Sequence, residues 1–430
     1  MKTISALIVA LVVAVTLPAE SQRPTYSGDW EAEARRDWVH VQLWLDGRGH
    51  STWGFSIDAD ELQGFNATGG DVDRATFRLV RDAGTVVFEG RFRGREGWGT
   101  FAFTPTEGFA RDMADLGYSS LSDRDVFRMA MHDVGRSFVR DLQSLGYRNV
   151  DRDDLMRMAI HGARPDFIRA MAAAGYGDLR VDELIRFRIH GVSPEFVSDM
   201  SNVGFRSMRP RDLVQARIHG VSAEYVRDMR EAGFEDLSFD QLRRMRIHGV
   251  DGDFAERLGE ALEEELSADD LVNMRIHGVD PEFSAEMAEL GYRDVPARDL
   301  QQLKIHGVTA GYIRGLRARG VEASNVRDVI QLRIHGVTPE YVDELGELGY
   351  RSLRHHELEQ MRIHGVTPRL VREMGELGFR DIPTRDLIQM KIHGVTPEFT
   401  ASMIEDYEGL TIRDLVEMRI HNHRWARKRK

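Results

Sequence analysis

The chain has 430 residues, of which 42% are hydrophobic and 30% are charged, which fits a well-solvated globular protein rather than a membrane-embedded or disordered one. Its formal net charge of −12 argues against a general nucleic-acid binder, because phosphate contacts need a basic face. The sequence has no cysteine, which excludes disulfides, a thiol nucleophile and a lipid-modified cysteine anchor.

The first residues have the layout of a secretory signal. One lysine precedes an apolar run from Ile4 to Leu17, which is short for a membrane span, and small residues follow it. We expect a signal peptide over residues 1–21, with cleavage after Ala19, and a linker over residues 22–37. The alternative is an uncleaved N-terminal anchor. A cleaved signal predicts that the protein is periplasmic or secreted.

From Trp38 to Thr104 apolar residues recur at every second position, which indicates β-strands. The sequences "DGRG" (46–49) and "RDAG" (81–84) are typical of turns. We therefore predict an antiparallel β-meander over residues 38–105 with about five strands, interrupted near 58–65 by a short helix or loop. This domain either closes the N-terminal end of the repeats that follow or forms a separate ligand-binding sheet.

A 29-residue repeat occupies most of the rest of the chain. Its clearest mark is a histidine that returns every 29 residues, and once after 28: His132, His161, His190, His219, His248, His277, His306, His335, His364, His393 and His421. Such a period predicts an α-solenoid of about eleven two-helix repeats over residues 106–423.

The first helix of a repeat has clear start and stop signals. In one unit Thr338 is a candidate N-cap, Pro339 suits the first helical position and Glu340 favours the positive end of the helix dipole. Gly349 then suits the left-handed residue of a Schellman turn, and Tyr350 supplies the apolar residue that packs back.

The second helix of the same unit has apolar residues on two sides. Leu358 and Met361 share one side, whereas Ile363 lies on another, which predicts a helix sandwiched between neighbours. In a different unit Ser267 and Asp270 have the spacing of a capping box.

The repeated histidine falls in the last turn of the second helix. The residue after it is glycine in nine units, Asp133 in the first and Asn422 in the last, and these three residue types tolerate the left-handed conformation best. We therefore predict a structural histidine that hydrogen-bonds exposed carbonyls at the helix end, so that His277→Gln costs about 1 kcal/mol and leaves the metal content unchanged. A role of the histidines in sensing pH is the alternative.

Known catalytic and metal-binding motifs are missing. The stretch "HHELEQ" (355–360) approaches the His-Glu-x-x-His of zinc peptidases, but Gln360 stands where the second histidine is needed. A histidine ladder with about 8–10 Å between stacked helices also cannot share zinc ions, whose donor atoms lie within roughly 3–4 Å of each other. We predict no catalytic, cofactor-binding or metal-binding residues and no cofactor.

A cation precedes the histidine by two residues in nine units, and these residues form a candidate recognition stripe: Arg188, Arg217, Arg246, Arg275, Lys304, Arg333, Arg362, Lys391 and Arg419. The first two units have Ala130 and Ala159 there. A basic ladder on an acidic protein suits an anionic ligand or an acidic protein surface. The competing interpretation is structural: the cations complement helix dipoles and pair with carboxylates such as Glu340. The basic tail over 424–430 is expected to be a solvated end, or a weak contact with anionic membrane.

The "RIHGVTPEF"-type units, together with the preceding "RDAGTVVFEGRF…GTFAFTP" segment (81–105), resemble a family of poorly characterised bacterial repeat proteins. Similar repeats look like extensions on sensor proteins of the BlaR/MecR type, which carry a membrane zinc-peptidase domain. This chain lacks the membrane helices and the His-Glu-x-x-His of that domain, so no peptidase activity follows. The resemblance implies an extracytoplasmic sensing or interaction module.

Three functions are compatible with the sequence. The first is non-catalytic recognition of a protein partner or an extended anionic ligand along the repeats, with no nucleic acid involved. The second is a hydrolase, or an accessory or sensor module of an enzyme, with its site in or near the β domain. The third is a structural spacer of the cell envelope.

Overall fold

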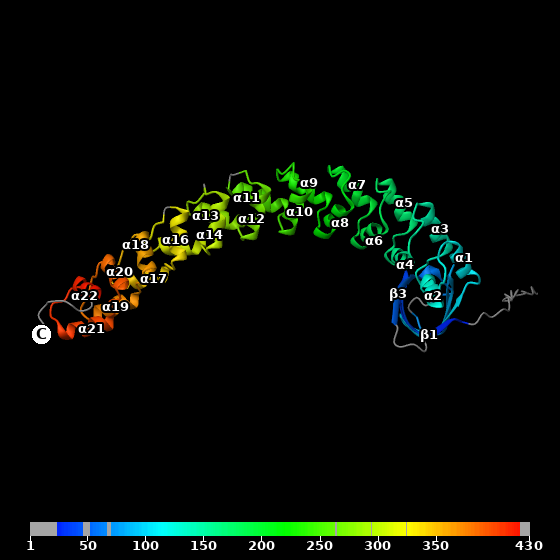
Figure 1. Cartoon of the computed structure of the whole chain (residues 1–430), viewed down its shortest axis with the longest axis horizontal. Coiled ribbons are helices and arrows are strands. Elements are labelled where there is room, and N and C mark those ends of the chain that lie inside the picture. Colours follow the sequence, from blue (N-terminus) through cyan, green and yellow to red (C-terminus); the bar gives the residue numbers. More distant parts are fainter. Residues whose placement is uncertain are drawn as a thin grey trace, which may run out of the picture. The chain divides into compact units, whose positions relative to one another are not determined.

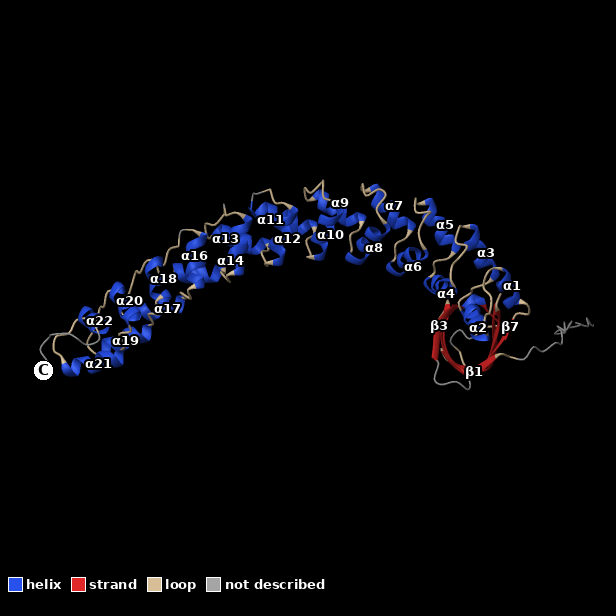
Figure 2. Cartoon of the chain, in the orientation of Figure 1, coloured by secondary structure: helices blue, strands red, loops and turns tan. Residues whose placement is uncertain are grey.

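The computed structural model describes residues 24–45, 52–66, 70–262, 265–293, 295–323 and 325–421. The expected signal peptide, the 46–49 turn, Asn422 and the basic tail lie outside these residues. Within them an antiparallel sheet precedes a long series of helices, which confirms the predicted α+β fold of a β domain and an α-solenoid (Figure 2).

The described residues form a single curled sheet of seven strands. The strands are β1 (Tyr26–Ala34), β2 (Trp38–Leu45), β3 (Thr52–Asp58), β4 (Leu62–Gln63), β5 (Val72–Arg81), β6 (Gly84–Arg93) and β7 (Glu96–Pro105), with a short 3-10 helix, η1 (Ala59–Glu61), before β4. The strand order is β3-β2-β1-β7-β6-β5-β4, and all neighbours are antiparallel. Arg81 pairs with Gly84 across a two-residue turn, as the "RDAG" sequence predicts.

The predicted linker over 22–37 is wrong, because β1 occupies its middle and pairs with both β2 and β7. Trp30, Ala32 and Ala34 are buried on one face of β1, whereas Asp29 and Glu31 are exposed on the other. The β domain therefore begins at Tyr26, and the estimate of five strands is too low. Two of the three buried residues of β1 are alanines, which are only weakly hydrophobic and are not typical of strands. The alternation of buried and exposed residues is therefore hard to recognise in the sequence.

The helices divide between two compact units, which are described separately. The first unit holds the sheet, α1 (Phe109–Asp115), α2 (Asp123–Met131), α3 (Arg136–Ser144), α4 (Arg152–His161), α5 (Pro165–Ala173) and α6 (Val181–His190). The division passes through α7 (Pro194–Asn202) and α8 (Pro210–His219).

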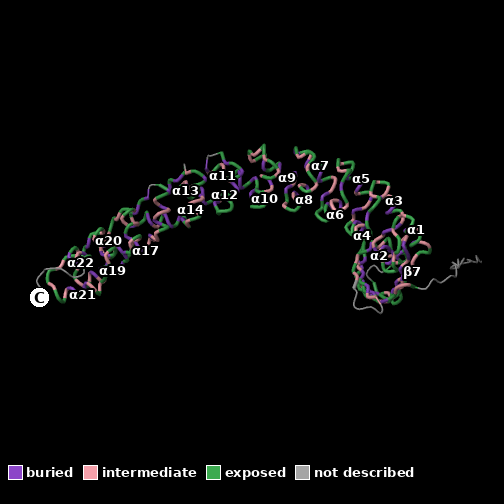
Figure 3. Tube along the Cα trace, in the orientation of Figure 1, coloured by how far each residue is buried: buried purple, intermediate pink, exposed green. Residues whose placement is uncertain are grey.

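The second unit holds α9 (Ala223–Glu231), α10 (Phe239–Ile247), α11 (Gly252–Leu262), α12 (Ala268–Ile276), α13 (Pro281–Glu289), α14 (Ala297–Ile305), α15 (Ala310–Arg317), α16 (Val326–Ile334), α17 (Pro339–Glu347), α18 (His355–Ile363), α19 (Pro368–Glu376), α20 (Thr384–His393), α21 (Pro397–Asp406) and α22 (Ile412–Ile420). Each odd-numbered helix contacts the next odd-numbered one and each even-numbered helix the next even-numbered one (Figure 1). Buried and exposed segments alternate along these helices, as two packed layers in water require (Figure 3).

The predicted start and stop signals of the helices are confirmed. Thr338 Oγ1 accepts a hydrogen bond from the Tyr341 N–H at 3.2 Å, so it caps α17. Gly349 has a φ of 97°, and the Tyr350 N–H donates to the Leu345 carbonyl at 2.9 Å, as a Schellman turn requires. Ser267 and Asp270 form the predicted capping box at α12.

The sheet packs against the first helix pair within the first unit. The Phe127 ring of α2 stacks against Tyr26 and Trp53, with centroids 5.4 and 5.3 Å away, and lies beside Phe101 and Phe103. The side chain of Arg136 at the start of α3 pairs with Asp82 in the β5–β6 turn. The backbone N–H of Arg136 also donates to Asp82 Oδ2 at 2.6 Å. These contacts support the interpretation of the sheet as an N-terminal cap.

Candidate functional site

From α6 onwards, a cation, an isoleucine and a histidine follow one another at the end of every even-numbered helix, and the histidine is either its last residue or its C-cap. The chain then turns sharply: in α16 the Gly336 N–H donates to the Arg333 carbonyl at 3.1 Å and the Val337 N–H to the Leu332 carbonyl at 2.9 Å. The nine glycines at this position have φ between 66° and 74°, and Asp133 has a φ of 54°. The predicted left-handed turn is confirmed, and it gives the three side chains the same setting in each unit.

Three of the repeat histidines bond to a glutamine of the preceding turn. The Nε2 atoms of His219, His335 and His393 lie 3.1–3.2 Å from the Oε1 atom of the glutamine four residues earlier. The expected bond to an exposed carbonyl is therefore wrong for these three, because the preceding turn offers a nearer acceptor. His132 differs: burial lowers its pKa, and the charges of Arg128 and Arg164 add to that effect.

Seven of the nine cations of the candidate recognition stripe stack on aromatic rings. Each lies over a ring of the preceding odd-numbered helix at 4.2–5.0 Å from its centroid: Arg188 over Phe167, Arg246 over Tyr225, Arg275 over Phe254, Lys304 over Phe283, Arg333 over Tyr312, Arg362 over Tyr341 and Arg419 over Phe399. These are cation–π distances.

A second contact of these cations reaches the end of the preceding even-numbered helix. Arg362 Nε donates to the His335 carbonyl at 3.3 Å, and Arg419 Nε donates to the Gly394 carbonyl at 2.8 Å. These cations therefore complement the dipole of the preceding even-numbered helix, rather than that of their own helix. Arg333 stacks on Tyr312 instead of pairing with Glu340. The cations with these contacts are structural, yet most of the nine remain exposed.

The isoleucine directly before the histidine is exposed in all ten units that have one. The fractions lie between 44% and 51% for Ile160, Ile189, Ile218, Ile247, Ile276, Ile305, Ile334, Ile363, Ile392 and Ile420. The prediction that Ile363 helps to bury a sandwiched helix is wrong, because no described neighbour covers that side. We call the eight members in the second unit, Ile218 to Ile420, the isoleucine row.

In the first repeat, the position of the exposed isoleucine is buried instead. Met131 of α2 replaces the isoleucine and is 5% exposed, and Ala130 replaces the cation and is fully buried. Met131 lies one helical turn after Phe127, on the face that packs against the sheet. In this unit the position is buried, on a helix that contacts β6 and β7 of the sheet.

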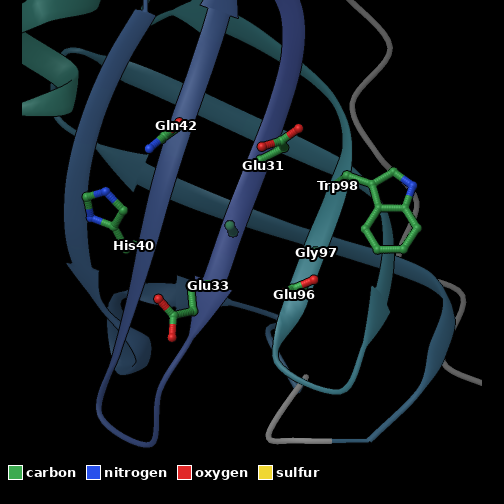
Figure 4. Close-up of a pocket in the computed structure, with 8 residues that line it drawn as sticks. Glu31, Glu33, His40, Gln42, Glu96, Gly97 and Trp98 are labelled. Carbon is green, nitrogen blue, oxygen red and sulfur yellow. The ribbon is translucent and has the colours of Figure 1, made fainter.

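A hollow lies on the solvent-facing side of the sheet (Figure 4). It has a volume of about 410 Å³ and is lined by Glu31 and Glu33 of β1, by His40 and Gln42 of β2 and by the segment from Glu96 to Trp98 of β7. Glu31 faces Gln42 and Trp98 across the strands, and Glu33 faces His40 and Glu96. The sequence analysis does not predict this hollow, because it assigns the residues of β1 to a linker.

No protein-family model and no curated protein matches this sequence. The resemblance to bacterial repeat proteins and to BlaR/MecR-type sensors therefore stays a prediction. Within the described ranges, every helix is too short or too polar to cross a bilayer. The same residues contain no group of three or more histidines, aspartates and glutamates arranged to hold a metal ion.

Proposed function

We propose that this protein is an exported, non-catalytic scaffold that recognises a protein or another extended ligand along the last turns of its even-numbered helices. The observation that carries the proposal is the repeated exposure of isoleucine at one position. A single exposed apolar residue is ordinary, whereas apolar residues that gather on one surface mark an interaction site.

The other repeated residues of this turn have a structural reason, and the isoleucine has none. The glycine adopts a positive φ, the valine after it is buried, and the cation stacks on a ring. The position three residues before the isoleucine, which is exposed in five of the ten units and half-buried in the others, varies among Arg, Gln, Asn and Glu. An isoleucine that stays constant beside a variable neighbour, at a position where water covers half of it, supports a role in binding.

Export rests on the apolar N-terminal segment, which has the layout of a secretory signal. It places the scaffold in the periplasm or outside the cell. N-terminal sequencing of the protein recovered from the envelope fraction tests this part, and an intact Met1 on protein from that fraction would contradict cleavage.

Crosslinking in the native host tests recognition. The wild type is compared with Ile305→Gln/Ile334→Gln and with Arg275→Gln/Arg333→Gln, and the matched control is Arg227→Gln/Arg372→Gln, which removes two exposed cations from α9 and α19. We expect one defined crosslinked partner that is lost in the first two variants and kept in the control. A partner that is retained in all variants would show that the row is not the binding surface.

The alternative, a hydrolase or an accessory or sensor module of an enzyme, is favoured by the hollow on the sheet, which brings three carboxylates and His40 together. Glu31→Gln/Glu33→Gln tests it. If the activity of the host pathway depends on these two residues and not on the isoleucine row, the alternative replaces our proposal.

A further inference from the structure

We propose that the isoleucine row binds an acidic, extended polypeptide segment, which places apolar side chains between the isoleucines and its carboxylates against the neighbouring cations. This inference rests on the proposed function and names the chemistry of its partner. The row, from α8 to α22, is the largest set of exposed aliphatic side chains in the described residues.

The charges beside the row are cationic on a protein that is acidic overall. Each isoleucine of the row follows an arginine or lysine directly in the sequence. The residues three positions earlier, which share its helix face, are Gln215, Arg244, Asn273, Gln302, Gln331, Gln360, Gln389 and Glu417. One of these eight is a carboxylate, although the chain has 70 Asp and Glu against 58 Lys and Arg. A partner that complements this surface is therefore acidic.

The interval of the row suits an extended chain. Stacked helices lie about 8–10 Å apart, and a polyproline-type segment advances about 9 Å in three residues. Such a segment presents one side chain to each isoleucine and leaves two others to reach the cations. A β-strand returns to the same face after about 6.6 Å, which does not match.

The first repeat shows why a polypeptide fits better than a lipid surface. There the equivalent position, Met131, is 5% exposed and lies one helical turn after Phe127, whose ring stacks on Tyr26 and Trp53 of the sheet. A carboxylate of the β domain, Asp82, pairs with Arg136 just beyond the turn. Apolar contact beside a carboxylate–cation pair is the chemistry that we infer for the row.

Differential peptide selection tests the inference. A display library of random peptides is selected on the full-length protein, with Ile305→Gln/Ile334→Gln/Ile363→Gln in solution as the competitor. The matched control is Val80→Gln, which removes an aliphatic side chain that is 46% exposed on the sheet. Thermal melting checks that every variant is folded, and vesicles of phosphatidylglycerol are the second probe.

We expect peptides rich in Asp and Glu with apolar residues three positions apart. They should bind the triple variant about tenfold or more weakly, bind Val80→Gln like the wild type, and lose affinity in Arg275→Gln/Arg333→Gln and at high salt. Selected peptides without acidic enrichment, or no peptides that distinguish wild type from the triple variant, would overturn the inference. So would vesicle binding that depends on the row, since it assigns the row to a membrane surface. If crosslinking still yields a partner that depends on the row, the proposed function survives that failure.

Discussion

His335 and Ile334 are neighbours in the sequence but contribute differently to the fold. His335 Nε2 lies 3.2 Å from Gln331 Oε1, whereas Asn273 stands at the equivalent position before His277. A polar pair four residues apart on a helix surface contributes about 0.5 kcal/mol. We expect His335→Ala to lower the free energy of unfolding by about that amount.

The estimate of about 1 kcal/mol for His277→Gln is then too large. We expect His277→Gln and His277→Ala to stay within about 0.3 kcal/mol of the wild type in urea unfolding, again with unchanged metal content. A loss at His277 equal to the loss at His335 would show that the glutamine bond is not the source of the effect.

Ile334 and Leu332 test whether the isoleucine row is part of the core. Leu332 is 1% exposed, so Leu332→Ala should cost about 2–5 kcal/mol, as other buried leucines do. Ile334→Gln should change stability by no more than about 0.5 kcal/mol, because half of the side chain already meets water. Urea unfolding of both variants measures this. A cost above about 2 kcal/mol for Ile334→Gln would make the row structural and remove the main support for both proposals.

At the scale of the helix, two glycines predict opposite effects of the same substitution. Gly336 ends α16 with a φ of 71°, where an added Cβ would also meet Arg362 at 2.9 Å. Gly336→Ala should therefore cost about 1–2 kcal/mol. Gly346 lies inside α17 with no atom within 4 Å of an added Cβ, so Gly346→Ala should stabilise by about 0.5–1 kcal/mol. Thermal melting checks the opposite signs, and equal signs would contradict the assigned turn.

Buried tyrosines connect the two helices of a repeat. The Tyr312 hydroxyl donates to the Val337 carbonyl at 2.7 Å, and the Tyr341 hydroxyl donates to the Val366 carbonyl at 2.9 Å. Burial raises the pKa of Tyr312 and of Tyr341 to about 12, although Arg333 and Arg362 oppose the shift. The folded pKa exceeds the ordinary value of about 10. The stability that the two protonated hydroxyls give the folded state is therefore fully present below pH 10, and it is lost as the pH rises from about 10 through 12.

We expect Tyr312→Phe/Tyr341→Phe to lower stability at neutral pH by about 1 kcal/mol for each hydrogen bond. The variant should also lose less stability than the wild type on going to alkaline pH. Urea unfolding at several pH values measures both effects. An unchanged alkaline slope would show that these hydroxyls are not the groups that titrate.

Local chemistry explains which elements were predictable. The caps at Thr338 and Ser267 and the turn at Gly349 follow from neighbouring residues, so the sequence predicts the helix pairs well. Strand β1 was missed because alanine gives weak alternation. The exposure of Ile363 was missed because apolar residues on two sides of a helix do not reveal which side a neighbour covers. Which side is covered depends on how the repeats pack. The hollow on the sheet likewise depends on how distant strands pair.

At the scale of the whole molecule, the sheet gives the first unit a closed end. A solenoid needs a terminal element that covers the apolar face of its first repeat, and Phe127 provides that face to the sheet. The cap also supplies a carboxylate: α3 begins after Gly135, which has no side chain, and Asp82 from the β5–β6 turn accepts the Arg136 N–H instead. No local pattern predicts this contact, because the two residues are 54 positions apart.

Asp82→Ala therefore removes a helix cap and an ion pair together, and we expect it to destabilise the first unit by about 1–3 kcal/mol. The matched control is Asp73→Ala, because Asp73 pairs with Arg93 on the same sheet at an exposed site, where such a pair contributes at most about 1 kcal/mol. Hydrogen exchange should accelerate at the first amides of α3 in Asp82→Ala and stay unchanged in α9–α22, since these helices belong to the other compact unit.

The pH dependence adds a second check on the same carboxylate. Hydrogen bonds from Arg136 lower the pKa of Asp82, so its contribution is complete above the ordinary aspartate value of about 3.9 and is lost as the pH falls through the lower folded value. The wild-type first unit should therefore lose more stability in acid than the Asp82→Ala variant. Equal acid sensitivity, together with α3 exchange like that of Asp73→Ala, would mean that burial around Phe127 alone holds the cap in place.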